Sequence, residues 1–170
     1  MSLRNLPERL LQRAIHAVLS ESGRVWTCSS GVHVQVLSPG RINVHEGPDI
    51  LNIAVYCDQV VTIGSAEVHH AASMWYAHGH ASDARYDDVV LHIVLNNDVP
   101  IAHIPWTLVI PQEDVLRGLR ALKHRTELDP AEHVDELQRA AFQRLSRNVA
   151  RSRAAVGRVG VHEALRMLTA

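Results

Sequence analysis

The chain has 170 residues, of which 46% are hydrophobic, so it is long and apolar enough to fold around one ordinary core, and its net charge of -1 at pH 7 indicates no particular partner. No apolar run approaches the 18 or so residues of a membrane span, and residues 1–12 lack the apolar core of a secretory signal. Its two cysteines are far apart in the sequence, so we expect reduced thiols and a cytoplasmic protein without membrane contact.

A helix is predicted over residues 7–20. Pro7 suits the first turn of a helix, Glu8 complements the positive end of the dipole, and apolar residues then recur at helical spacing. Strands are indicated where β-branched residues cluster or alternate with polar ones. The predicted strand segments, which we expect to form a central sheet of about five strands, cover residues 25–28, 32–36, 50–56, 60–70, 89–95 and 106–110.

Residues 71–88 have no clean period and are predicted to form a long loop with a helical turn. The pattern becomes helical from residue 112, with helices expected over 113–123, over 130–153 and after Gly160. A strand block with helices at its ends indicates an α+β or mixed α/β fold. We expect one domain, in which a helix and sheet core (residues 1–110) carries a helical extension (residues 111–170).

Two acidic residues and a histidine occur on neighbouring predicted strands. Asp49 precedes one strand, while Glu67 and His69 are two residues apart on the next and so project from the same face. Consecutive strands usually lie side by side, so these three residues are expected to converge as a catalytic group. Two carboxylates with a third ligand commonly hold Mg²⁺ or Mn²⁺ against a phosphate, and such a metal makes hydroxide available near neutral pH.

This pattern resembles the PD-(D/E)xK nuclease superfamily, in which a helix carrying a glutamate precedes a Pro-Asp strand and a Glu-x-Lys strand. Pro48-Asp49 and Glu67-Val68-His69 match, with His69 where the superfamily has lysine. The resemblance implies a restriction-endonuclease-like core and cleavage of phosphodiesters. Lys123, the only lysine of the chain, lies in a predicted helix far along the sequence.

A second polar group lies in the predicted 71–88 loop. His78 and His80 form a His-x-His pair followed closely by Asp83, a ligand set suited to Zn²⁺, Mn²⁺ or iron. The alternative is a polar loop whose histidines cap turns. The candidate metal ligands are Asp49, Glu67, His78, His80 and Asp83, with Glu8 and His92 just outside them. We expect a divalent metal, Mg²⁺ or Mn²⁺ first and Zn²⁺ as the alternative.

A longer series of short motifs runs through the middle of the chain: Gly40-Arg-Ile-Asn43, Gly47-Pro-Asp-Ile-Leu-Asn52, Glu67-Val-His69, Trp75-Tyr76, His78-Gly-His80, Asp83, Tyr86-Asp-Asp-Val89 and Leu91-His-Ile-Val94. In this order the motifs resemble the bacterial family "domain of unknown function 2851". That resemblance implies that the candidate residues form one group and that histidine at position 69 belongs to the family pattern. Met74 departs from the pattern, since the family shows aspartate there.

The C-terminal part is basic. Residues 137–162 contain six arginines and no acidic residue, and Arg144, Arg147 and Arg151 share one helical face. Such a stripe suits contact with the phosphates of a nucleic acid. The alternative is a solvated face on an arginine-rich chain.

Three functions remain open from the sequence. The first is a metal-dependent, nuclease-like phosphodiester hydrolase. The second is a catalytically inactive relative that binds nucleic acid or protein, which the missing lysine favours. The third is a histidine-rich, metal-dependent hydrolase of another class, suggested by the 12 histidines. A plain structural module also stays open, as does the oligomeric state, a homodimer included.

Overall fold

The computed structural model of the chain describes residues 3, 6–21 and 23–127. The chain divides into two compact units, residues 1–124 and residues 125–170. Nearly all of the second unit lies outside the described residues. The helices predicted over 130–153 and after Gly160 therefore lie outside them too. The same holds for the three arginines of the predicted basic stripe, Arg144, Arg147 and Arg151.

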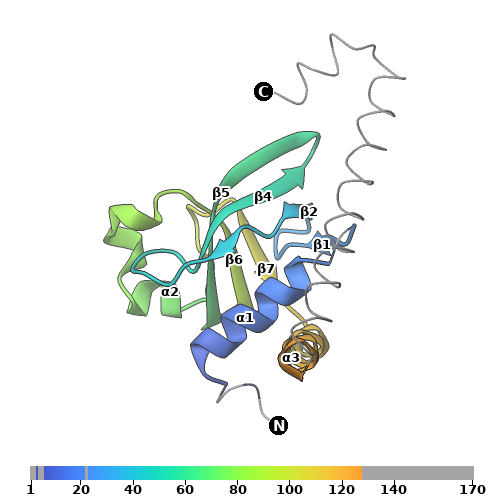
Figure 1. Cartoon of the computed structure of the whole chain (residues 1–170). Coiled ribbons are helices and arrows are strands. Elements are labelled where there is room, and N and C mark those ends of the chain that lie inside the picture. Colours follow the sequence, from blue (N-terminus) through green and yellow to red (C-terminus); the bar gives the residue numbers. More distant parts are fainter. Residues whose placement is uncertain (1–2, 4–5, 22, 128–170) are drawn as a thin grey trace, which may run out of the picture. The chain divides into compact units, whose positions relative to one another are not determined.

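The first unit begins with a helix, continues through a sheet and ends in a second long helix (Figure 1). This is the expected mixed α+β fold. Its elements are α1 (Glu8–Leu19), β1 (Val25–Thr27), β2 (His33–Ser38), β3 (Arg41–Ile42), β4 (Ile50–Cys57), β5 (Val60–Ala71), α2 (Met74–Ala77), the 3₁₀ turns η2 (His80–Ser82) and η3 (Ala84–Tyr86), β6 (Val89–Asn96), β7 (Trp106–Val109) and α3 (Gln112–Glu127).

The sheet has seven strands in the order β1-β2-β4-β5-β6-β7, with β3 paired to β4. Pairing is antiparallel from β1 to β5 and parallel from β5 through β6 to β7. The predicted strand segments match the observed ones to within about two residues. The expected number of about five strands was too low: all six predicted segments form strands, and β3 adds a seventh, which has only two residues and is too short to show a period.

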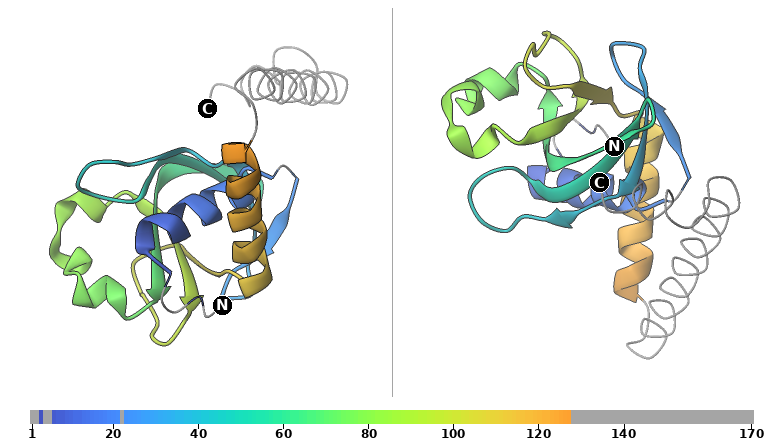
Figure 2. Two further views of the ribbon diagram at one scale, coloured as in Figure 1. Left: turned by 60° about the horizontal axis from the view of Figure 1, so that its bottom comes forward. Right: turned by 90° about the horizontal axis from the view of Figure 1, so that it is seen from above.

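One face of the sheet carries α1 and α3, which pack together (Figure 2). Leu11, Ile15 and Val18 of α1 are buried against strand residues of this face, and Val115 of α3 joins the same cluster. A Cβ at Gly118 would lie 2.2 Å from the Ala14 carbonyl oxygen, so the two helices approach each other as closely as glycine allows.

The opposite face of the sheet carries the polar residues of the candidate site. Along β5, Ala66 and Val68 point into the core beneath α1, so Glu67 and His69 point the other way. β6 runs in register beside it and places His92 opposite Glu67 on this second face. The segment that crosses from β5 to β6 contains α2, η2 and η3 (Figure 1), and its residues Trp75 and His80 pack against His92 and His69.

A buried ion pair joins the start of the sheet to α3. The guanidinium of Arg24 donates two hydrogen bonds to Asp114, at 2.8 and 2.5 Å, and Arg117 lies 2.6 Å from the same carboxylate. Asp114 is only 2% exposed, so its charge depends on these partners. The hydrogen bonds from Arg24 hold the pKa of Asp114 below its ordinary value, with a smaller contribution from Arg117.

Asp114→Asn is expected to lower the free energy of unfolding at pH 7 by about 2 kcal/mol, because the arginines lose their anion. Since the folded-state pKa of Asp114 is lowered, the stabilisation is present above the ordinary carboxyl pKa of about 4 and is lost as the pH falls through the lowered value. The difference between the two proteins should therefore shrink below about pH 4. Denaturant titrations of both proteins over this range test it, with the exposed Glu113→Gln as the control.

None of the described helices combines the length and the apolar character needed to cross a membrane.

Candidate metal centre

The turn before β4 is held by Asn43 and positions Asp49. The Asn43 side-chain amide donates to the carbonyl oxygens of Glu46 and Pro48, and its backbone N–H donates to the carbonyl of Asp49. Gly40, at φ +69°, lies so close to β4 that a Cβ would approach the Leu51 carbonyl oxygen to 2.3 Å. The glycine and the asparagine of the Gly-x-x-Asn motif thus have structural roles in presenting Asp49.

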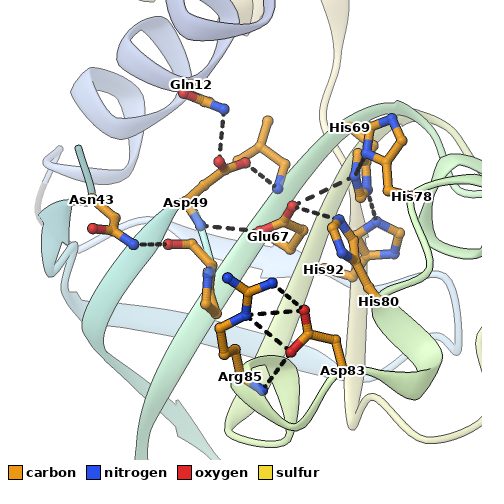
Figure 3. Close-up of polar contacts among 12 residues, drawn as sticks. Gln12, Asn43, Asp49, Glu67, His69, His78, His80, Asp83, Arg85 and His92 are labelled. Carbon is orange, nitrogen blue, oxygen red and sulfur yellow. Dashed lines mark hydrogen bonds and ion pairs between the residues drawn. The ribbon is translucent and has the colours of Figure 1, made fainter. Parts of the chain in front are cut away.

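Asp49 contacts Glu67, as the pairing of β4 with β5 predicts, but it does so through its backbone. The Asp49 N–H donates to Glu67 Oε2 at 3.0 Å. The Asp49 carboxylate accepts hydrogen bonds from the Gln12 side chain at 2.7 Å and from the Val68 N–H at 3.0 Å (Figure 3). Both oxygens of this carboxylate are therefore engaged, on the side of Glu67 away from the histidines.

Burial makes both carboxyl groups weak acids. Desolvation, with a smaller contribution from the charge of Glu8, raises the pKa of Asp49 above its ordinary value, against the lowering effect of its hydrogen bonds. Desolvation and the nearby Asp49 charge raise the pKa of Glu67 as well. Two acidic groups in such surroundings favour a cation beside them, because a positive charge stabilises the ionised forms.

Three histidines meet next to Glu67. Potential ligand nitrogens of His69, His78 and His80 all lie within 4.8 Å of one another, so the group could hold a metal ion. His69 comes from β5, and the other two come from the crossover segment that folds back over the strand. Burial lowers the pKa of His69 to about 3, with the neighbouring histidines adding to the shift, and burial also lowers the pKa of His80. Both rings are therefore neutral near pH 7, the form that binds metals.

The spacing of the atoms in this group suits a small coordination sphere. His69 Nε2 lies 3.2 Å from His78 Nδ1, and Glu67 Oε1 lies 3.1 Å from His80 Nε2 and 3.5 Å from His69 Nε2. Ligands at 2.0–2.1 Å from a tetrahedral zinc ion would be about 3.3 Å apart. These three contacts therefore have the spacing of ligands around a divalent cation, while the histidine nitrogens as a group lie within 4.8 Å of one another.

One buried nitrogen of His80 lacks a hydrogen-bond partner within the described part of the chain. Its Nε2 is buried and lies 3.1 Å from Glu67 Oε1, but the angle is not that of a hydrogen bond, and among the described residues this nitrogen has no hydrogen-bond partner. A buried nitrogen without a partner is costly. A cation between His80 and its neighbours would satisfy it.

His92 contacts His69 and so lies just outside the candidate ligands, as expected. It is fully buried, and its Nε2 lies 2.9 Å from His69 Nδ1, which leaves His69 Nε2 for the His78 side. Trp75 packs on His80 and His92, and Tyr86 stacks on His80 with ring centroids 3.8 Å apart. Neighbours of this kind fix the orientation of metal-binding imidazoles.

Asp83, which we predicted as a ligand, binds an arginine instead of joining the histidines. Arg85 donates several hydrogen bonds to the Asp83 carboxylate, between 2.6 and 3.0 Å, and these lower the pKa of Asp83 to about 2 (Figure 3). The same guanidinium contacts Glu46 at 2.5 Å. This exposed network ties the crossover segment to the turn before β4.

The structure thus brings together most, though not all, of the predicted site residues. Glu67, His69, His78, His80 and His92 lie together, and Glu8 is close enough to raise the pKa values of both carboxyl groups. Sequence reasoning did not identify Gln12, which holds the Asp49 carboxylate. Its spacing of four residues from Glu8, on the same helical face, was the available signal.

Two pockets lead to this region. One, of about 550 Å³, lies between α1 and residues 42–45 and reaches Asp49. The other, of about 250 Å³, is lined by Trp75, His80, Tyr86 and His103. His78 is exposed. The two sides of the site are therefore reachable from solvent.

The family model described as "Protein of unknown function (DUF2851)" matches residues 16–159. The chain belongs to this family. The match includes the β4, β5 and crossover residues that form the histidine and carboxylate group, so the site lies within the segment that defines the family. No curated protein and no solved structure matches the chain.

Proposed function

We propose that this DUF2851 protein is a metal-dependent phosphodiester hydrolase, with its metal held by His69, His78 and His80 and with Glu67 beside them. The observation that carries the proposal is the convergence of three imidazole nitrogens, two of them from rings with lowered pKa values, next to a buried carboxylate. A structural core gains little from such an arrangement, because buried polar groups without partners cost stability.

The ligand chemistry bears on which metal is bound. Imidazoles suit Zn²⁺ and other transition metals, whereas Mg²⁺ prefers carboxylate, carbonyl and water oxygens. A site built on three histidines with one carboxylate alongside therefore favours Zn²⁺ or Mn²⁺ over Mg²⁺. This preference changes the order expected from the sequence, which placed Mg²⁺ or Mn²⁺ first because the carboxylates of Asp49 and Glu67 were taken as two of the ligands.

The phosphodiester class is supported by the surroundings of Asp49. The Pro48-Asp49 strand lies antiparallel to the strand with Glu67 and His69, and the preceding helix carries Glu8 near both carboxyl groups. This order of helix, aspartate and glutamate is the one on which the resemblance to the PD-(D/E)xK superfamily rests, and it supports a phosphodiester substrate. The pocket that reaches Asp49 is also lined by two arginines, which suit a phosphate.

The chain's residues have defined parts in the proposed reaction. A bound divalent metal would polarise a phosphoryl oxygen and lower the pKa of water in the site. The oxygen of water forms a bond to phosphorus, and Glu67 accepts the proton that this water loses. The bond from phosphorus to the ester oxygen breaks, and the electron pair leaves with that oxygen, which takes a proton from solvent. Asp49, through its backbone N–H, and His92, through His69, act as positioning residues.

Purified full-length protein, stripped of metal with a chelator, should not cleave DNA, RNA or bis-p-nitrophenyl phosphate. Adding Zn²⁺ or Mn²⁺ is expected to restore cleavage, and Mg²⁺ to restore less, because the donors are mainly nitrogens. Product formation with each metal at matched concentrations measures the effect. An absence of cleavage with every metal and substrate would favour the catalytically inactive relative.

A further inference from the structure

The larger pocket next to the site has walls of different charge. It is about 550 Å³, within the range of pockets that take a nucleotide-sized ligand and larger than a single phosphate needs. Residues of α1 form one wall, and residues 42–45 form the other, with Asp49 at the inner end. The pocket reaches Asp49, whose backbone N–H donates a hydrogen bond to Glu67.

The acidic and the basic residues of α1 lie on two adjacent strips of the helix surface. Glu8 and Gln12 are four residues apart and form one strip, and Gln12 binds the Asp49 carboxylate. Arg9 and Arg13 are also four residues apart and form the adjacent strip, and both line the pocket. The pocket therefore has an acidic end beside the candidate metal centre and a basic wall next to it.

Both arginines are free to bind an anion. Arg9 and Arg13 are exposed, and within the described part of the chain neither forms an ion pair with a carboxylate. By contrast, Arg24, Arg85 and Arg117 are all paired with acidic side chains. Guanidinium groups match phosphate oxygens in geometry and charge, so two unpaired arginines on one wall suit a phosphate.

We infer that this pocket binds the backbone phosphate next to the one that is cleaved, through Arg9 and Arg13, so that the substrate is a polynucleotide strand and not an isolated phosphodiester. This inference depends on the proposed function, because it takes the histidine and Glu67 group, to which Asp49 at the inner end of the pocket is hydrogen-bonded, as the place of cleavage. The size of the pocket leaves room for the nucleoside that joins the two phosphates.

Binding of fluorescein-labelled DNA and RNA oligonucleotides to the metal-stripped full chain tests the inference without any turnover. Arg13→Ala is expected to weaken binding about tenfold and to reduce the slope of log affinity against log salt by about one. Arg9→Ala should do the same. Arg120→Ala removes an equally exposed arginine from α3, outside the pocket, and serves as the matched control. Comparing the DNA and RNA strands shows which backbone the pocket accepts.

The loaded enzyme gives a second measurement. For an oligonucleotide, Arg9→Ala and Arg13→Ala should raise KM about tenfold, while Arg120→Ala, outside the pocket, should leave KM unchanged. Wild-type protein that binds neither strand, or pocket variants that bind like Arg120→Ala, would overturn the inference even if cleavage is observed. Normal binding without cleavage would instead count against the proposed function alone.

Discussion

His78→Ala is expected to weaken Zn²⁺ binding by at least about 100-fold, as measured by competition with a chromogenic chelator. The reason is that His78 supplies one of only three imidazole nitrogens that meet at the site. Because the side chain is exposed, its removal should lower the free energy of unfolding of the metal-free protein by no more than about 1 kcal/mol, the contribution of its hydrogen bond with His69. Loss of binding would thus reflect a lost ligand and not a lost fold.

His33→Ala is the matched control for this prediction. His33 is also an exposed histidine, but it lies on β2, where it contacts Thr27, and it takes no part in the three-histidine group. Zn²⁺ affinity should be unchanged in this variant. Equal affinities of His78→Ala and wild-type protein would show that the three histidines do not hold the metal.

Glu67→Gln is expected to lower kcat for phosphodiester cleavage by about 10²–10⁴-fold, the usual contribution of a general base. The substitution keeps the shape of the side chain, and the amide oxygen can still accept the hydrogen bond from the Asp49 N–H. It removes the group that accepts the proton of the attacking water. Single-turnover kinetics with saturating metal measure the effect on the chemical step.

Asp83→Asn provides the comparison for Glu67→Gln. Asp83 is an acidic residue of the same region, but its carboxylate binds Arg85 instead of facing the histidines. We expect kcat to stay within about threefold of the wild-type value, because an exposed ion pair contributes little to stability. Glu67 would not be the general base if Glu67→Gln retained the wild-type kcat, or if Asp83→Asn lowered kcat more than Glu67→Gln did.

Local patterns were sufficient to predict most of the fold. Alternating and β-branched residues identified β4, β5 and β6 nearly to their ends, and the apolar stripe identified α1. The strand β5 runs through Gly64. A Cβ there would approach the Asp88 carbonyl oxygen to 2.5 Å, so the glycine allows close packing against the start of the neighbouring strand. The ion pair between Arg24 and Asp114 could not be predicted, because it joins elements 90 residues apart.

The site was predictable where it depends on strand geometry and less so where it depends on the crossover segment. The two-residue spacing of Glu67 and His69, together with antiparallel pairing to β4, was sufficient to place them near Asp49. That the crossover folds back and brings His78 onto His69 follows from its packing on Trp75, which has no periodic signal. The pairing of Asp83 with Arg85 likewise depends on local turns.

The most direct test of the central claim is a crystal structure of the full chain soaked with Zn²⁺, with anomalous data collected at the zinc edge. If the three histidines hold the metal, one strong peak should lie about 2.0–2.1 Å from nitrogens of His69, His78 and His80, with Glu67 alongside. A peak held elsewhere, or no peak among these three rings at saturating Zn²⁺, would contradict that claim.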